Sequence, residues 1–237
     1  MTSRDVQQKL RSLASAEVAV RSAKFFKTGP GDYGHGDTFI GIRIPTLRQV
    51  AREFRDLPLN EIGNLLQSAI HEERMLALLI LVKSVERGDA TRRKAVFDCY
   101  LENLQYVNNW DLVDSSAPAI VGGWLQDKSR QILRKWARSE NLWERRIAII
   151  ATQYFIRLND FEETLAISRL LLNDQEDLIH KAVGWMLREV GKRDVATLDS
   201  FLKQHQAVMP RTMLRYAIEK FPAEKRLAVL RARHGSE

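Results

Sequence analysis

The chain is poor in the residues and segments that define several common protein classes. Its 237 residues include one cysteine, Cys99, which excludes an internal disulfide framework and gives no sign of an oxidising compartment. No apolar run reaches the roughly 18 residues that suggest a transmembrane helix, and the first ten residues have no apolar signal core. We therefore expect a cytoplasmic protein that does not cross a membrane.

Several catalytic and cofactor motifs are also missing. The five histidines are scattered, with no H-E-x-x-H spacing and no cluster of cysteine partners, so we expect no metal. No Ser-His-Asp arrangement stands out, and no Gly-x-Ser-x-Gly elbow is present. The glycine-rich segment lacks the Gly-Lys-Ser/Thr of a phosphate-binding loop, and no strand precedes it as in a dinucleotide-binding fingerprint. We expect no organic cofactor.

The charge of the chain is positive and uneven. The net charge is +7, and residues 1–118 contribute +1 of it whereas residues 119–237 contribute +6. A basic second half suits a polyanion such as DNA or RNA. A soluble protein that merely has a high isoelectric point fits the charge equally well.

The apolar pattern predicts an all-helical protein. Only six prolines and twelve glycines interrupt the chain, and apolar residues recur at i, i+3 and i+4 over long stretches. Residues 71–87, 141–158 and 176–191 are the clearest helices. No alternating strand pattern or hairpin signal is present.

The helices recur at a nearly constant interval. Arg74, Arg146, Lys181 and Arg215 each precede a short apolar run, and Trp110 falls where a further unit is expected; the spacings are 36, 36, 35 and 34 residues. Any all-helical chain can produce accidental near-periods, but five in succession favour a true repeat. The period is typical of an α-solenoid of HEAT-like helix pairs, in which equivalent positions face one surface. We expect a single repeat domain over residues 1–237 with these five residues on that surface.

Residues 28–44 break the helical pattern. They contain five glycines between Gly29 and Gly41, which favours a turn-rich loop. Pro45 is suited to the first turn of the helix that follows. The loop either covers a bound ligand or phosphate backbone, or simply connects N-terminal helices.

The sequence Asn-Asn-Trp-Asp-Leu-Val-Asp-Ser-Ser at 108–116 is the strongest candidate for a site. If a helix begins at the asparagines, Trp110 and Asp114 lie at i and i+4 on one face. Asp111 then lies in the first turn, where the helix dipole favours a negative charge, whereas Asp114 has no such explanation. The pair is either an ordinary half-buried contact or a site for a cationic group. Trp185 is open to both a core and a ligand-contacting interpretation.

Three segments together resemble one family. Residues 108–116, Asn141-Leu-Trp-Glu-Arg-Arg146-Ile-Ala and His180-Lys-Ala-Val-Gly-Trp185-Met-Leu-Arg188-Glu are similar to the AlkD-like DNA alkylation repair family, in matching order over about residues 20–220. The family's N-terminal aromatic would correspond to Phe25 or Phe26. The resemblance implies a C-shaped α-α superhelix of HEAT-like repeats with a concave basic groove. It also implies a monomeric glycosylase that meets alkylated double-stranded DNA in the cytoplasm and nucleoid.

The resemblance implies roles for individual residues. It assigns Asp114, Trp110 and Trp185 to catalysis, and Arg146 and Arg188 to DNA binding, with Arg74, Lys181 and Arg215 added by the repeat. The expected reaction is hydrolysis of the N-glycosidic bond of cationic N3- or N7-alkylated purines, without a pocket that receives a flipped base. Asp114 would stabilise positive charge on the deoxyribose. Two alternatives are a catalytically silent DNA-structure binder and a protein-interaction solenoid.

Overall fold

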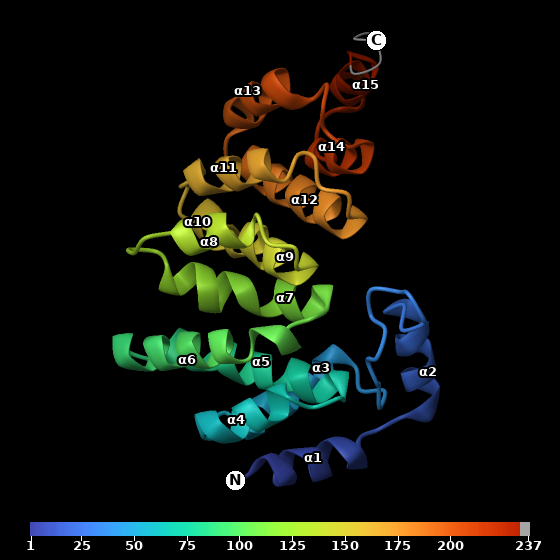
Figure 1. Ribbon diagram of the computed structural model, residues 1–237, viewed down its shortest axis with the longest axis vertical. Helices are drawn as coiled ribbons and strands as arrows, with labels where there is room; N and C mark the ends of the chain where they lie inside the picture. Colours follow the sequence, from blue (N-terminus) through green and yellow to red (C-terminus); the bar gives the residue numbers. More distant parts are fainter. Residues whose placement is uncertain (233–237) are drawn as a thin grey trace. The chain divides into compact units, whose positions relative to one another are not determined.

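The computed structural model describes residues 1–232, and the prediction of an all-helical fold is confirmed over that range. The only extended pairing there is an isolated parallel bridge between Thr38 and Ile70. The chain forms two compact units, the first over residues 1–124 and the second from residue 125 onward (Figure 1). Each unit is a stack of α-helices of 5 to 17 residues. A single uninterrupted domain over residues 1–237 stays a prediction.

The first unit is organised around one long buried helix. Helix α5 packs against α3, α4, α6 and α7, and Leu76, Leu78 and Ile80 of α5 are fully buried. A helix that is apolar on nearly every side requires such complete coverage. The helical segments of this unit are α1 (Ser3–Ser12), α2 (Ala16–Phe25), α3 (Ile44–Glu53), α4 (Leu59–Leu66), α5 (His71–Arg87), α6 (Ala90–Glu102), η1 (Leu104–Tyr106), α7 (Trp110–Ala117) and η2 (Pro118–Gly122).

The second unit is organised around α12, which packs against α9, α11, α13 and α14. Gly184 allows the close approach of α14, because a Cβ atom there would lie 2.5 Å from the Met213 carbonyl oxygen. Its helices are α8 (Gln131–Trp136), α9 (Leu142–Ala151), α10 (Gln153–Arg157), α11 (Glu162–Leu170), α12 (Asp177–Arg193), α13 (Val195–His205), α14 (Arg211–Ala217) and α15 (Ala223–Ala232).

The predicted helices match the observed ones with one correction. The bounds of α5 are those predicted, and the prediction for 176–191 corresponds to α12. The predicted helix over 141–158 is instead divided at Thr152 into α9 and α10. The Thr152 hydroxyl donates to the Ile149 carbonyl at 2.7 Å, and threonine hydroxyls bonded back to the preceding turn often bend helices.

The predicted repeat corresponds to real helices. The five marker positions all lie within the first five residues of their helices, which are α5, α7, α9, α12 and α14 in chain order. The α-α repeat fold inferred from the spacing is therefore present. The period identified the recurring helix of each pair.

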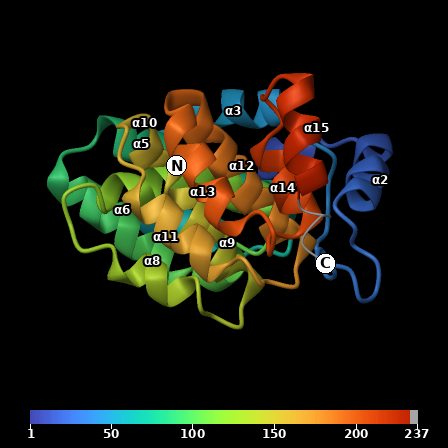
Figure 2. The same ribbon diagram turned by 90° about the horizontal axis from the view of Figure 1, so that it is seen from above.

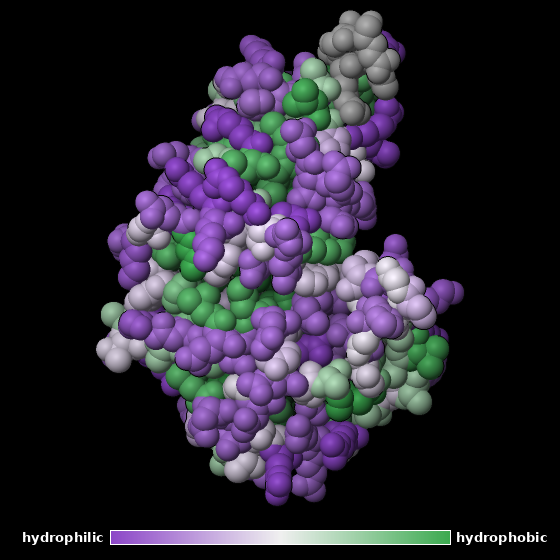
Figure 3. Space-filling model, viewed as in Figure 1, coloured by the Kyte–Doolittle hydropathy of each residue, from purple (hydrophilic) through white to green (hydrophobic). Residues whose placement is uncertain are grey.

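Helix α2 and the loop that follows it form one edge of the first unit. Both views place α2 on the opposite side of α3 from α6 (Figures 1 and 2). No residue of α2 is buried, and Val20 and Phe25 are 73% and 65% exposed. Apolar surface is visible at this edge in the space-filling view (Figure 3). The loop thus begins from a thinly packed helix and must be held in place by other contacts.

Candidate functional site

Helix α7 begins at Trp110, as the sequence predicted. Asn109 is its N-cap: the side-chain oxygen accepts from the Trp110 amide at 2.8 Å, and the backbone oxygen accepts from the Val113 amide. Asp111 lies in the first turn, and its carboxylate accepts from the Leu112 amide at 2.9 Å. Trp110 and Asp114 are therefore one helical turn apart, and both are half-buried.

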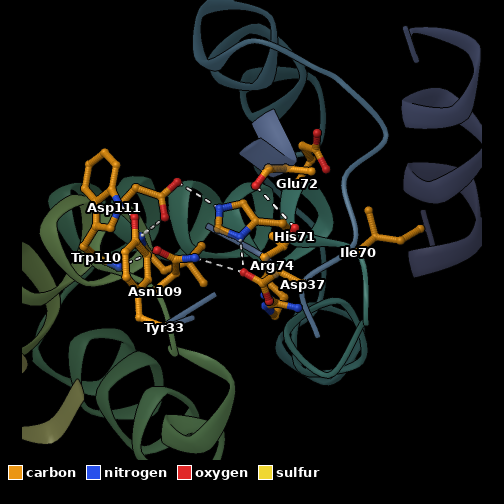
Figure 4. Close-up of polar contacts among 12 residues, drawn as sticks. Tyr33, Asp37, Ile70, His71, Glu72, Arg74, Asn109, Trp110 and Asp111 are labelled. Atoms are coloured by element: carbon orange, nitrogen blue, oxygen red, sulfur yellow. Dashed lines mark hydrogen bonds and ion pairs between the residues drawn. The ribbon is translucent and has the colours of Figure 1, made fainter. Parts of the chain in front are cut away.

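The indole of Trp110 lies among aromatic side chains from the end of α2 and from the glycine-rich loop. Phe26 stacks on it, with ring centroids 5.3 Å apart and an interplanar angle of 22°. Phe25 meets it edge-on at 5.9 Å. The indole N–H donates to the Tyr33 hydroxyl at 3.3 Å, as the close-up shows (Figure 4). Trp110 thus lies beside Phe25, a large aromatic side chain that is exposed to solvent.

Asp114 lines a hollow in the surface of the first unit. The hollow has a volume of about 540 Å³, and its charged lining residues are Arg48 and Arg52 of α3, Lys83 and Glu86 of α5, and Asp114 of α7. Arg48 and Arg52 are exposed, and Lys83 is half-buried with an ion pair to Glu86 at 2.6 Å. With Lys83 and Glu86 paired, Arg48 and Arg52 leave a positive local charge beside the Asp114 carboxylate.

The three cations of this hollow were not among the predicted residues. The net charge of residues 1–118 is only +1, which hides a local cluster of positive side chains. The i, i+4 spacing of Arg48 and Arg52 is a signal that could have been used, because it places both on one face of a helix. Lys83 carries no comparable signal in the sequence.

A buried polar network lies beneath Trp110 and the loop. His71 contacts Asp37 through Nδ1 and Asp111 through Nε2, both at 2.9 Å. The other oxygen of Asp37 accepts from Arg74, and Asn109 donates to Asp37 at 3.0 Å. Figure 4 shows these side chains converging from the loop, α5 and the start of α7.

Arg74 requires a correction. The repeat placed it on a DNA-facing surface, but its side chain is buried, with 4% of the residue exposed. Its guanidinium pairs with Asp37 and donates to the Ser68 carbonyl at 2.8 Å. A buried cation needs such partners, so Arg74 stabilises the network and is not a surface ligand for a phosphate.

The pKa values of the network follow from its contacts. Burial alone would lower the pKa of His71, but hydrogen bonds and charges from Asp111 and Asp37 outweigh it and raise that pKa. Burial alone would raise the pKa of Asp37, but the hydrogen bond from His71, the charge of Arg74 and the hydrogen bond from Asn109 outweigh it and lower that pKa. The network favours an imidazolium between two carboxylates.

The second unit carries the remaining predicted residues. Arg146 is 4% exposed and donates to the Leu178 carbonyl at 2.6 Å. Trp185 is half-buried and donates to Glu189 at 3.1 Å, and Lys181 pairs with Asp177 at 2.7 Å.

Arg188 and Arg215 differ in their surroundings. Arg188 pairs with Glu219 and lies 3.5 Å from Glu189, whereas Arg215 is exposed on α14. Roles in DNA binding for the residues of this unit, and the grouping of all the predicted residues in one basic groove, stay predictions.

Neither a metal cluster nor a membrane segment is found in the described part of the chain. Within residues 1–232 no three His, Cys, Asp or Glu side chains are placed to hold a metal ion. In the same range no helix combines the length and apolar character required to cross a bilayer.

Helix pairs repeated along the chain define an α-α repeat protein of HEAT-like type, in which α7 carries the tryptophan and the carboxylate of the candidate site. The model of the family described as DNA alkylation repair enzyme matches residues 6–221, so the chain belongs to that family. Membership assigns the protein to DNA alkylation repair, with DNA as its partner.

A solved structure supports the fold. The predicted DNA alkylation repair enzyme from Enterococcus faecalis is similar with a TM-score of 0.71 and 20% sequence identity, over 89% of this chain and 97% of that one. At this identity the likeness concerns the fold alone. A search among curated proteins finds no match.

Proposed function

We propose that the protein is a DNA glycosylase that hydrolyses the N-glycosidic bond of cationic N3- or N7-alkylated purines in duplex DNA. One observation carries the proposal: Asp114, one helical turn from Trp110, lines a hollow with Arg48 and Arg52 and with the Lys83–Glu86 ion pair. A polyanionic duplex is attracted by the cations, while the carboxylate is positioned for a reacting centre that becomes positive. A protein-interaction solenoid would instead show no salt-dependent binding of DNA.

The proposed reaction needs little from the protein because the substrate is already activated. The bond from C1′ to the alkylated purine breaks, and the electron pair leaves with the base, which departs uncharged. The deoxyribose acquires oxocarbenium character, which the Asp114 carboxylate stabilises. Water then adds to C1′ and loses a proton, for which Asp114 is the proposed general base. An abasic site and a free alkylpurine result.

Aromatic side chains would add to this stabilisation. The face of a tryptophan attracts cationic character by about 0.5–2 kcal/mol. Trp110 is held by Phe26 and Tyr33, and the exposed Phe25 extends the same aromatic group toward solvent. We propose that Trp110 packs against the damaged nucleotide while the base stays outside any enclosing pocket. Trp185 remains a proposed contact with the sugar.

The test is release of N7-methylguanine from a defined duplex. Wild-type protein should release the base well above the buffer rate, and Asp114→Asn should lower the rate by about 100-fold or more, as loss of a general base does. The matched control is Asp56→Asn, which removes a carboxylate that is 75% exposed. Both substitutions remove one negative charge, so both variants should bind undamaged DNA at least as well as wild type.

Two results would overturn this proposal. Absence of wild-type release with DNA binding retained would indicate a silent DNA-structure binder. Equal release by Asp114→Asn and wild type would remove Asp114 from the mechanism.

A further inference from the structure

His71 is bound by a carboxylate at each ring nitrogen. The distances from Nδ1 to Asp37 and from Nε2 to Asp111 are both 2.9 Å, and the residue is 2% exposed. A neutral imidazole has one N–H, so it could donate to only one of two ionised carboxylates. Asp37 also accepts from Arg74 and Asn109, which requires acceptor oxygens. The arrangement therefore favours an imidazolium that donates to both carboxylates.

The two carboxylates belong to segments far apart in the sequence. Asp37 lies near the end of the glycine-rich loop, and Asp111 lies in the first turn of α7. His71 is the first residue of α5, and its backbone amide donates to the Thr38 carbonyl at 2.8 Å. One side chain thus joins three segments at the point where α5 and α7 begin.

The end of the loop is anchored a second time by Glu72. Its carboxylate accepts three backbone N–H groups, from Ile40 at 3.1 Å, Gly41 at 2.7 Å and Ile42 at 3.2 Å. Charge-assisted hydrogen bonds of this kind are stronger than neutral ones. The end of the loop is therefore fixed to α5, and its middle projects from a fixed base.

A series of stacked rings connects His71 to Trp110. The imidazole of His71 stacks on Phe39 at 4.5 Å, and Phe39 stacks on Phe26 at 5.0 Å. Phe26 stacks in turn on Trp110, and Tyr33 from the middle of the loop accepts the indole N–H. The hydrogen-bond partner of the indole therefore belongs to the loop whose end His71 and Glu72 hold, and the stacking partner, Phe26, also lies against the His71 ring at 5.0 Å.

We propose that His71 is a positioning residue, which joins the glycine-rich loop to the first turn of α7 and thereby sets the orientation of the Trp110 indole. The inference rests on the proposed function, in which Trp110 meets the damaged nucleotide. Its own burial keeps His71 from touching DNA, so it acts only through Trp110 and α7. The glycine-rich loop is then a fixed arm of the site.

The charged groups around His71 support an imidazolium. The loop contributes Asp37, α7 contributes Asp111, and α5 contributes Arg74 on Asp37 and Glu72 on the loop backbone. With His71 charged, the two cations His71 and Arg74 offset Asp37 and Asp111. Loss of the His71 proton leaves an uncompensated negative charge in a buried site, which is costly.

The test measures the environment of the Trp110 indole directly by ¹⁹F NMR. Protein labelled with 5-fluorotryptophan gives one ¹⁹F resonance for each tryptophan, and Trp110→Phe identifies that of Trp110. His71→Gln should shift or broaden this resonance and lower kcat for base release by about 10- to 100-fold, the scale of a misplaced group, with KM for DNA unchanged. The control is His35→Gln, at an exposed position of the same loop, which should change neither.

A double substitution distinguishes positioning from general damage. If His71 acts through Asp111, the effect of His71→Gln combined with Asp111→Asn should be smaller than the sum of the single effects. Full additivity, or an unchanged Trp110 resonance in His71→Gln, would overturn the proposal. If wild-type protein releases no base but the resonance still moves, the glycosylase assignment fails while the positioning role of His71 stands.

The wild-type protein provides a measurement that needs no variant. With ¹⁵N-labelled histidine, both ring nitrogens of His71 should be protonated at neutral pH. This remains decisive if His71→Gln does not fold. A single protonated nitrogen on His71 at neutral pH would refute the double-donor arrangement.

Discussion

The basic hollow beside Asp114 makes a quantitative prediction about DNA binding. Each cation that neutralises a DNA phosphate releases counterions and contributes about 0.9 to the slope of log K against log salt. Arg48 and Arg52 are exposed on the hollow and Lys83 shares its charge with Glu86, so the two arginines should dominate. Arg48→Gln with Arg52→Gln should lower the slope by about 1.8, and adding Lys83→Gln should bring the loss to at most about 2.7.

The expected change is large enough to measure. A slope difference of about 1.8 means that wild type loses about 12-fold more affinity than the double variant between 50 and 200 mM salt. The assay is fluorescence anisotropy with an undamaged labelled duplex. The control substitutes Arg4, Arg11 and Lys94 by glutamine, which removes three exposed cations of the first unit that do not line the hollow. Equal slopes for the control and the hollow variants would show that the hollow does not contact phosphates.

Further predictions concern the loop and the buried network. A Cβ at Gly34 would lie 2.3 Å from the Phe26 carbonyl oxygen, so Gly34→Ala should displace Tyr33, move the Trp110 ¹⁹F resonance and slow base release. The control is Gly63→Ala, where the nearest contact of a Cβ is at 3.9 Å, and it should cause none of these changes. Because folding raises the pKa of His71, the protonated side chain stabilises the folded protein. This stabilisation is fully present below the unfolded-state pKa of about 6.5 and is lost as the pH rises through the folded-state pKa. Urea unfolding should therefore show stability falling above neutral pH in wild type and not in His71→Gln. The lowered pKa of Asp37 acts oppositely: its contribution is present above the unfolded value of about 3.9 and is lost as pH falls through the folded pKa, so Asp37→Asn should reduce the loss of stability on acidification.

Local sequence patterns predicted the helices well because the information lies within each helix. The apolar spacing of residues 71–87 identifies α5, and Asn109 before Trp110 identifies the start of α7. The assignment of Asp111 to the first helical turn was also correct. These features depend on residues within a few positions of one another.

The buried network could not be predicted in the same way. His71 meets Asp37 and Asp111 across 34 and 40 residues of chain, and a helical period does not say which loop folds back on which helix start. The spacing of the histidines is unsuitable for metal ligands, and nothing near His71 in the sequence indicates its carboxylate partners. Asp111 had a sufficient explanation in the helix dipole, which concealed its second contact with His71.

The repeat positions show why a period identifies a fold more reliably than a site. Arg74 pairs inside the protein, Arg146 donates to a backbone carbonyl, and Lys181 pairs with a residue of its own helix, although all three occupy equivalent positions. These contacts differ from helix to helix, so the period identifies the helix starts without assigning these side chains to DNA. Trp110 is the position where the basic pattern fails, because an aromatic side chain replaces the expected cation. The departure at Trp110 is therefore the stronger indication of function. The exposed cations lie on α3 instead, beside Asp114 one helical turn further along α7.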